Sequence, residues 1–245
     1  MFGYLNIFCS SLLLALFLQV AHGKTAEDFL QGARLHAAAH QPVTLYATIH
    51  GGEQTIPLTF VLGKNSLQYQ FHDPEETLLF NLQPSSSSLR LLKTGLSSSL
   101  DNERRYQEFR GTGLNYDDLA LGFLYWKNPH IISKEMVRGL RTVVIELTAP
   151  SLSKTNLSIP DRNIRLWIDA DHDTLLRMES HDEEGKLLKR FEVLSAQKIN
   201  GFWMLKEMRF EIFDPKKGEV TKRRYLTMSR EDQSTSAPSP NISPK

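Results

Sequence analysis

Apolar and polar side chains alternate along most of this 245-residue chain. The clearest run is 202–213, where Met204, Met208 and Phe210 fall on one side and charged side chains on the other. A period of two residues is that of a β-strand with one dry face and one wet face. Turn-forming pairs such as Asn200-Gly201 separate it from similar runs at 163–169, 174–180, 186–199 and 219–228. The pattern predicts an antiparallel meander over 162–228.

The first half of the chain repeats this alternation in five shorter runs between 43 and 93. Short strands at intervals of about 8–12 residues favour a sandwich or barrel over an α/β fold. Pro57 lies inside the second run and lacks an N–H to donate, so we expect that strand at an edge or a bulge. The pattern dissolves into serines and charges at 95–111, which predicts a loop, with a helix over 101–109 as the alternative. Alternation resumes as one strand at 135–147.

Two segments have helical spacing instead. Thr25 and Asp28 form a capping box that opens a helix to about residue 39. A second, short helix is predicted at 117–126, with Leu119, Phe123 and Trp126 on one face. A polar loop precedes it and a proline follows it, so both flanks can hinge. We interpret this helix as a lid, and for a lid over a hollow cavity Phe123→Ala would cost only about 1–2 kcal/mol of stability, less than in a packed core.

Together these elements predict a mainly β (α+β) fold. About ten or eleven twisted antiparallel strands are too many to stay flat, so the sheet should curve strongly. A curved sheet has a concave apolar face, and only the two helices are available to cover it. The predicted organisation is one domain over 24–230.

The two ends of the chain differ from this domain. Residues 1–23 carry no charged side chain, and an apolar stretch precedes Ala21-His22-Gly23, which predicts a secretory signal cleaved after Gly23. An uncleaved anchor is the alternative. The single cysteine, Cys9, lies in that segment, so the mature chain would depend on its hydrophobic core rather than on disulfides. The Ser- and Pro-rich segment 231–245 is predicted to be a disordered tail.

Composition removes several classes of function. The formal net charge is +1, which gives no field of one sign for nucleic acid or an anionic surface. Asp169, Asp171 and Asp173 have calcium-loop spacing, but Thr174 and Ser180 stand where that loop needs Gly and Glu. We find no nucleophile motif and no glycine-rich phosphate cradle. The prediction is therefore a protein that is not an enzyme and has no metal and no cofactor.

A series of short motifs resembles the LolA-like proteins, in the broader "outer membrane lipoprotein-sorting protein" branch. The motifs are GLNYDDL at 113–119, VRGLRTVVIELTAP at 137–150, IRLWID at 164–169, TLLRME at 174–179, DEEGKLL at 182–188 and KINGFW at 198–203. The resemblance implies an unclosed β-barrel whose concave face is lidded by helices and holds acyl chains. It implies a monomeric periplasmic carrier of lipoproteins or lipids that takes part in outer-membrane lipoprotein sorting. Its partners would be an inner-membrane transporter or an outer-membrane acceptor.

The expected ligand contacts follow from the lid and the concave face: Leu119, Phe123, Trp126, Met204, Met208 and Phe210. One departure from the family matters, because no arginine here matches the cavity arginine with which the proteobacterial carrier latches its lid. The cargo therefore stays open between a triacylated lipoprotein and a free lipid. The alternative function is a periplasmic sensor or adaptor of the same fold that binds a partner protein.

Overall fold

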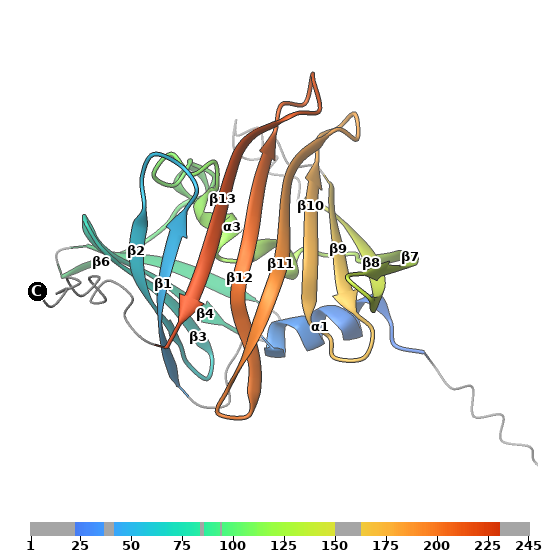
Figure 1. Cartoon of the computed structure of the whole chain (residues 1–245), viewed down its shortest axis with the longest axis horizontal. Coiled ribbons are helices and arrows are strands. Elements are labelled where there is room, and N and C mark those ends of the chain that lie inside the picture. The colour runs from blue at the N-terminus through green and yellow to red at the C-terminus, as the bar shows by residue number, and fades with distance from the viewer. Residues whose placement is uncertain (1–22, 37–41, 84–85, 94, 150–162, 231–245) are drawn as a thin grey trace, which may run out of the picture.

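The structure is a computed structural model, and it describes residues 23–36, 42–83, 86–93, 95–149 and 163–230. The predicted signal, apart from Gly23, and the predicted tail lie outside these residues. Thirteen strands form a single antiparallel sheet that curls without closing (Figure 1). The strands of the first half are β1 Val43–His50, β2 Ile56–Leu62, β3 Ser66–His72, β4 Glu75–Leu82, β5 Ser87–Lys93 and β6 Leu96–Ser99. Those of the second half are β7 His130–Val137, β8 Leu140–Thr148, β9 Asn163–Asp169, β10 Leu175–His181, β11 Leu187–Ile199, β12 Phe202–Phe213 and β13 Val220–Ser229.

The sheet consists of two meanders joined at its centre. Its order is β6-β5-β4-β3-β2-β1-β13-β12-β11-β10-β9-β8-β7, so every neighbour is also a neighbour in sequence except the pair β1 and β13. The two free edges are therefore β6 and β7, at opposite ends of the curled sheet. Because β6 precedes β7 in the chain, the connection at 100–129 has to pass from one edge to the other. We call this connection the cover segment.

The helices lie in the cover segment and ahead of β1. They are α1 Ala26–His36, α2 Asn102–Arg105, α3 Tyr116–Leu119 and a single 3₁₀ turn, η1 Gly122–Tyr125. The predicted capping box of α1 is confirmed, since Thr25 N–H donates to the Asp28 carboxylate and Asp28 N–H donates to Thr25 Oγ1. The longest of these described helices has eleven residues, and none combines the length and the apolar character of a membrane span.

The structure confirms the fold class and corrects the strand count. Both extra strands come from segments that the alternation did not resolve. The predicted loop after residue 95 contains the short edge strand β6, and the run around 135–147 is a hairpin of β7 and β8. Its turn, Arg138-Gly139, has φ values of 51° and 83°, as type I′ hairpin turns require. Pro57 is not at an edge: β2 lies inside the sheet, and its ladder with β3 begins one residue later, at Leu58.

The helix predicted at 117–126 is in fact two short pieces. Leu121 lies between α3 and η1 with φ 49°, a left-handed conformation that interrupts a right-handed helix. Gly122 follows, and a Cβ at this position would collide with the Asp117 carboxylate, so a larger residue would require that side chain to move. Because a helix of four residues cannot stabilise itself, this part of the chain depends on its tertiary contacts.

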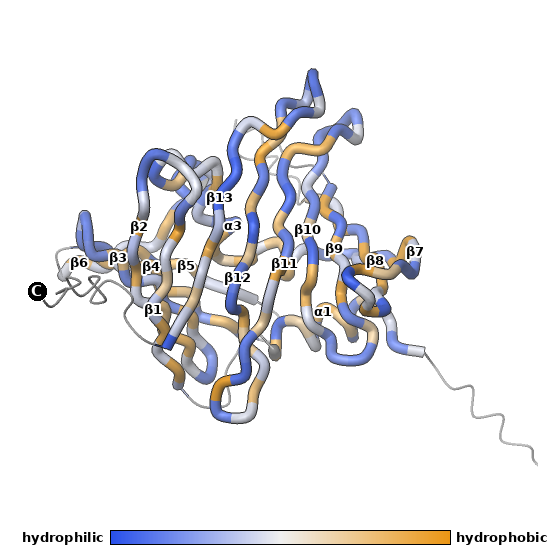
Figure 2. Tube along the Cα trace, in the orientation of Figure 1, coloured by the Kyte–Doolittle hydropathy of each residue, from blue (hydrophilic) through white to orange (hydrophobic). Residues whose placement is uncertain are grey.

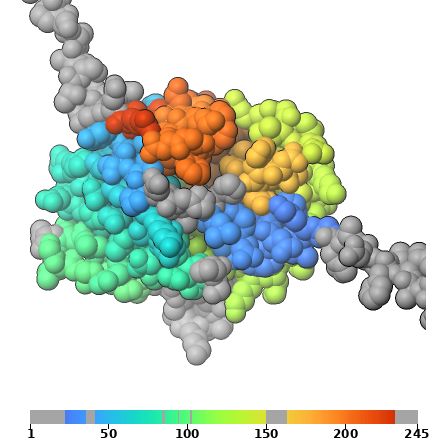
Figure 3. All heavy atoms as spheres, turned by 90° about the horizontal axis from the view of Figure 1, so that it is seen from below, coloured from blue at the N-terminus to red at the C-terminus, as the bar shows by residue number. Residues whose placement is uncertain are grey.

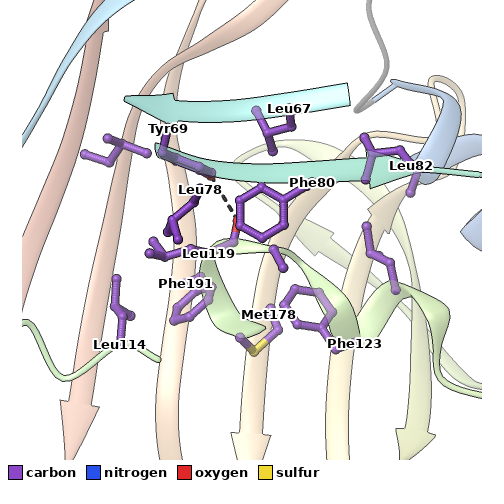
Figure 4. Close-up of a cluster of buried hydrophobic side chains, with 14 of the residues drawn as sticks. Leu67, Tyr69, Leu78, Phe80, Leu82, Leu114, Leu119, Phe123, Met178 and Phe191 are labelled. Carbon is purple, nitrogen blue, oxygen red and sulfur yellow. Dashed lines mark hydrogen bonds between the residues drawn. The ribbon is translucent and has the colours of Figure 1, made fainter. Parts of the chain in front are cut away.

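The core lies on the concave face of the sheet. Along β1 to β4 alternate side chains are buried, and Figure 2 shows the corresponding alternation of apolar and polar positions. Figure 4 shows how the cover segment closes this core: Leu119 and Phe123 lie between Leu78 and Phe80 on one side and Met178 and Phe191 on the other. The concave face is thus filled by side chains from both meanders and from the cover.

Candidate apolar binding site

The core is hollow at one place. A cavity of about 250 Å³ lies between the two meanders and the cover segment. Its wall is formed largely by apolar side chains. From the sheet these include Phe60, Leu62, Leu67, Tyr69, Phe191, Val193, Met204, Met208, Phe210, Leu226 and Met228. From the helices and the cover they include Ala33, Leu114, Leu119, Leu121 and Leu124.

Four of the six predicted contact residues meet at this cavity. Leu119, Met204, Met208 and Phe210 line it, from α3 and from β12. Phe123 and Trp126 are also on the inner side of the cover, but they are not part of the wall. They are packed in the core, with exposed fractions of 2% and 8%. The sequence grouped Leu119, Phe123 and Trp126 on one helical face. The break at Leu121 ends that face, so Leu119 lines the cavity whereas the other two pack in the core.

The two methionines give the cavity wall room to adapt. Met204 and Met208 are only partly buried, and both lie against the core rather than inside it. A methionine side chain is unbranched and has three rotatable bonds, so it fits irregular and changing shapes. This part of β12 can therefore change side-chain conformation without a change in the backbone.

Two hydrogen-bond donors hold the cover from opposite sides. Arg34, on α1, is buried and donates from Nε and Nη2 to the carbonyl oxygen of Leu124, at 2.8 and 2.6 Å. Tyr69, on β3, donates its hydroxyl to the carbonyl oxygen of Leu119 at 3.1 Å, the contact drawn in Figure 4. Burial raises the pKa of Tyr69, so its hydroxyl keeps its proton and remains a donor.

An ion pair fixes α3 to the sheet. Lys189 of β11 points to the concave side and its Nζ lies 2.9 Å from the carboxylate of Asp118. The same carboxylate accepts the N–H of Asn115, whose side chain in turn accepts the N–H of Asp118, so α3 has a complete capping box. Arg105 of α2 pairs with the neighbouring Asp117. The cover is therefore held by several polar contacts around the apolar wall.

The sequence interpretation missed these holding residues. Arg34 falls inside the apolar stripe of α1, directly after the buried Ala33. Lys189 shares the inward side of β11 with Phe191. A charge at an apolar position is the signal that could have found both, since a buried charge needs a partner. The sequence does not say which partner the topology supplies.

A second hollow, of about 1140 Å³, lies at the turn between β1 and β2 and is of another kind. It is wide open and is bordered by polar groups, among them Asp73, Arg110 and Arg224. The Arg110 guanidinium already donates to Glu76 and to the carbonyls of Asp73 and Pro74. This hollow lacks the apolar wall of the cavity under the cover.

The aspartates with calcium-like spacing point to separate partners. Asp171 pairs with Arg141, Asp173 pairs with Lys24, and Asp169 accepts the N–H of Asp171. Among the described residues, no group of three His, Cys, Asp or Glu side chains is arranged to hold a metal ion.

Several solved structures have a similar architecture. A domain classed as outer membrane lipoprotein-sorting, from Vibrio parahaemolyticus, superimposes with a TM-score of 0.62 at 14% identity, over 83% of this chain and 90% of that one. A DUF1329 family protein from Desulfovibrio piger gives 0.59 at 17% identity, over 84% and 92%. A LolA superfamily protein from Nitrosomonas europaea gives 0.58 at 17% identity, over 84% and 92%. At such identities the likeness is one of fold.

The architecture is therefore a LolA-like fold, an open antiparallel sheet with helices over its concave face. A family model described as "Uncharacterized protein" matches residues 93–236, and the chain belongs to that family. No curated protein matches the chain in sequence.

Proposed function

We propose that this protein is a periplasmic carrier that holds acyl chains of lipoproteins or lipids in the cavity under the cover segment. It would take part in outer-membrane lipoprotein sorting by binding, without catalysing a reaction. The observation that carries the proposal is the cavity itself, whose wall is largely apolar on the sheet side and on the cover side, with Asp118 and Thr174 as its polar members. Hydrocarbon is the ligand chemistry that such a wall favours, because each methylene moved from water into it contributes about 0.8 kcal/mol.

The size of the cavity indicates how the cover must behave. At about 250 Å³ it is smaller than the range of roughly 300–1,000 Å³ typical of ligand pockets. A long acyl chain therefore needs the cover to move outward or the methionines to shift. Releasing the cover breaks the contacts of Arg34 and Tyr69, which are worth about 0.5–3 kcal/mol each.

These magnitudes favour long chains over short ones. The loss of these two contacts costs about 1–6 kcal/mol, which roughly one to eight buried methylenes offset at about 0.8 kcal/mol each. A ligand with only a short apolar part cannot compensate for opening, whereas a fatty acyl chain can. The proposed cargo is therefore a molecule with at least one long acyl chain.

The proposal is tested by a substitution that fills the cavity with a larger side chain from its own wall. Met208→Trp places a larger side chain where the ligand would lie, and Met136→Trp places the same side chain on the exposed surface of β7 as a matched control. We expect Met208→Trp to weaken uptake of a fluorescent fatty-acid probe about tenfold or more, near 1.4 kcal/mol, and the control to leave it unchanged. Native mass spectrometry of protein from its own envelope should show bound lipid. Equal uptake by both variants would contradict the proposal.

A second candidate function is the binding of a partner protein, and one observation favours it. The edge strand β7 presents Ile131, Ile132 and Met136 to solvent, next to backbone groups that pair with no strand of the described residues. Such an edge can accept a strand from another chain. This candidate gains support if Met208→Trp leaves the biological activity intact while Ile132→Lys abolishes it, and it loses support in the opposite case.

A further inference from the structure

The end of the hairpin between β11 and β12 carries two large apolar side chains in solvent. Phe202 is 52% exposed and Trp203 is 73% exposed. The turn that presents them is Asn200-Gly201, whose φ values of 50° and 88° fit a tight two-residue hairpin. In Figure 1 this hairpin end extends below the sheet, and the view from below in Figure 3 shows it as the orange knob beside the first sheet strands and α1.

The wall of the cavity reaches solvent at Thr174, Ala196 and Trp203, and we take this end of the cavity as its mouth. Trp203 lines the cavity although most of its surface faces solvent, and its neighbours Met204 and Leu205 continue the wall inward. Ala196, on the opposite strand of the hairpin, is both exposed and part of the wall. An apolar path therefore runs from the exposed tip into the cavity.

Along the hairpin end itself the exposed charges have one sign, although the net charge of the whole chain is only +1. Between residues 194 and 206, and at the described end of β13, the exposed charged side chains are Lys198, Lys206 and Arg230. Lys198 is paired in register with Trp203, so a cation and an aromatic ring share one face of the hairpin. Arg230 donates to the side chain of Asn200 in the turn.

We propose that this hairpin end inserts into the interface of an anionic lipid bilayer and brings the mouth of the cavity to the acyl chains. Aromatic side chains prefer the boundary between headgroups and hydrocarbon, and nearby lysines and arginines are attracted to anionic headgroups. A narrow tip with two aromatic side chains suits a wedge into lipid. It offers little of the roughly 800 Å² per partner that a stable protein interface requires. The inference rests on the proposed function, since it says where the acyl chain would enter.

Trp203 supplies the probe for the test. The chain has three tryptophans, and the other two, Trp126 and Trp167, are buried. On mixing the full chain with vesicles of equal parts phosphatidylglycerol and phosphatidylcholine, we expect the tryptophan emission to shift to the blue. Lipids brominated along the acyl chain should quench it. With Trp203→Phe this shift and this quenching should disappear while most of the vesicle binding remains.

Sedimentation with the same vesicles measures the contribution of each group. The tip variant, which combines Phe202→Ser and Trp203→Ser, should weaken vesicle binding about tenfold or more, because it lacks both aromatic side chains. The matched control is Leu96→Ser with Met136→Ser, two exposed apolar residues at the sheet edges, and it should bind like the parent. Lys198→Gln and Lys206→Gln should each weaken binding about fivefold at low salt and less at high salt.

Three results would overturn the inference. The first is an emission spectrum of the parent that vesicles do not change. The second is equal loss of binding in the tip variant and the edge control. The third is a parent that sediments as a dimer while the tip variant sediments as a monomer, which would make the tip a contact between copies. If the parent takes up the fatty-acid probe but does not bind vesicles, only this inference is refuted. If the parent binds vesicles but does not take up the fatty-acid probe, the proposed function is refuted.

Discussion

At the scale of single residues, stability depends on polar groups placed where water does not reach them. His181, at the end of β10, is buried, and within the described part of the chain its Nδ1 has no hydrogen-bond partner. Burial, and next the positive charge of Arg165, lower the pKa of His181 from its usual value of 6.5, although Glu179 acts in the opposite direction. The native state therefore takes up a proton at this imidazole less readily than the unfolded chain does.

This gives a pH prediction with a definite sign. The unfolded chain binds the proton near pH 6.5 and the folded chain only at lower pH, so this contribution to stability is complete above about 6.5 and is lost as the pH falls below it. In His181→Gln, which does not titrate, the free energy of unfolding should fall less between about pH 7.5 and pH 5 than in the parent. Urea unfolding at a series of pH values measures the free energy of unfolding of the parent and of the variant. If the two free energies fall in parallel with pH, His181 does not cause the loss of stability.

The packing of Phe123 changes the expected cost of its truncation. The lid interpretation assigned it about 1–2 kcal/mol, but the side chain is packed in the core and does not line the cavity. We now expect Phe123→Ala to lower the free energy of unfolding by about 3–5 kcal/mol. Met208→Ala, on the partly buried cavity wall, should cost less than half as much. Denaturant unfolding with unchanged m-values compares the two, and a Phe123→Ala cost below that of Met208→Ala would argue for a loosely packed cover.

At the scale of elements, one ion pair joins α3 to the second meander, while Tyr69 joins it to the first. The Lys189 and Asp118 pair is buried, and each of these groups would be costly to leave inside alone. Lys189→Met should therefore destabilise the protein by about 3–5 kcal/mol, while adding Asp118→Asn should restore part of that loss. The double-mutant cycle in urea measures the coupling. Strictly additive costs would mean that the cover does not depend on this pair.

Long elements were the easiest to predict from the sequence. The strands from β9 to β13 follow from alternation because one face of each is dry, and their turns are rich in Asn, Asp and Gly. β6 was missed because its four residues are all exposed, so no alternation marks it. β7 was merged with β8 because it is an edge strand with an almost wholly exposed pattern. Alternation reports burial, and strands without a buried face do not show it.

The site was predictable only as far as residues within one strand or one turn. Met204, Met208 and Phe210 could be grouped because they recur at even spacing along β12, although the ladder with β11 shifts register between the two methionines. Their place beside Leu119 depends on the path of the cover segment. Arg34 and Leu124 are 90 residues apart, and Lys189 and Asp118 are 71 apart. Contacts at such separations are set by topology, which local periodicity does not contain.

At the scale of the whole molecule, the open sheet leaves two edges, and they are protected unequally. β6 is short, whereas β7 has eight residues and exposes Ile131, Ile132 and Met136. A long, exposed, apolar edge promotes association with other chains, and a lysine on the edge opposes it. Ile132→Lys should leave the free energy of unfolding within about 0.5 kcal/mol of the parent and raise the concentration at which light scattering begins. Unchanged scattering would show that this edge is already guarded by other means.

The pairing of the first strand with the last has a consequence for synthesis. A ribosome makes β1 before any other strand and β13 after all of them, yet these two strands lie side by side in the sheet. Until β13 is added, β1 and β12 are each unpaired on one side, so the growing chain has four open strand edges instead of two. Exposed strand edges are where nascent chains aggregate, and factors that hold them apart are most needed then. The interval of greatest risk therefore ends only when Val220–Ser229 has been made.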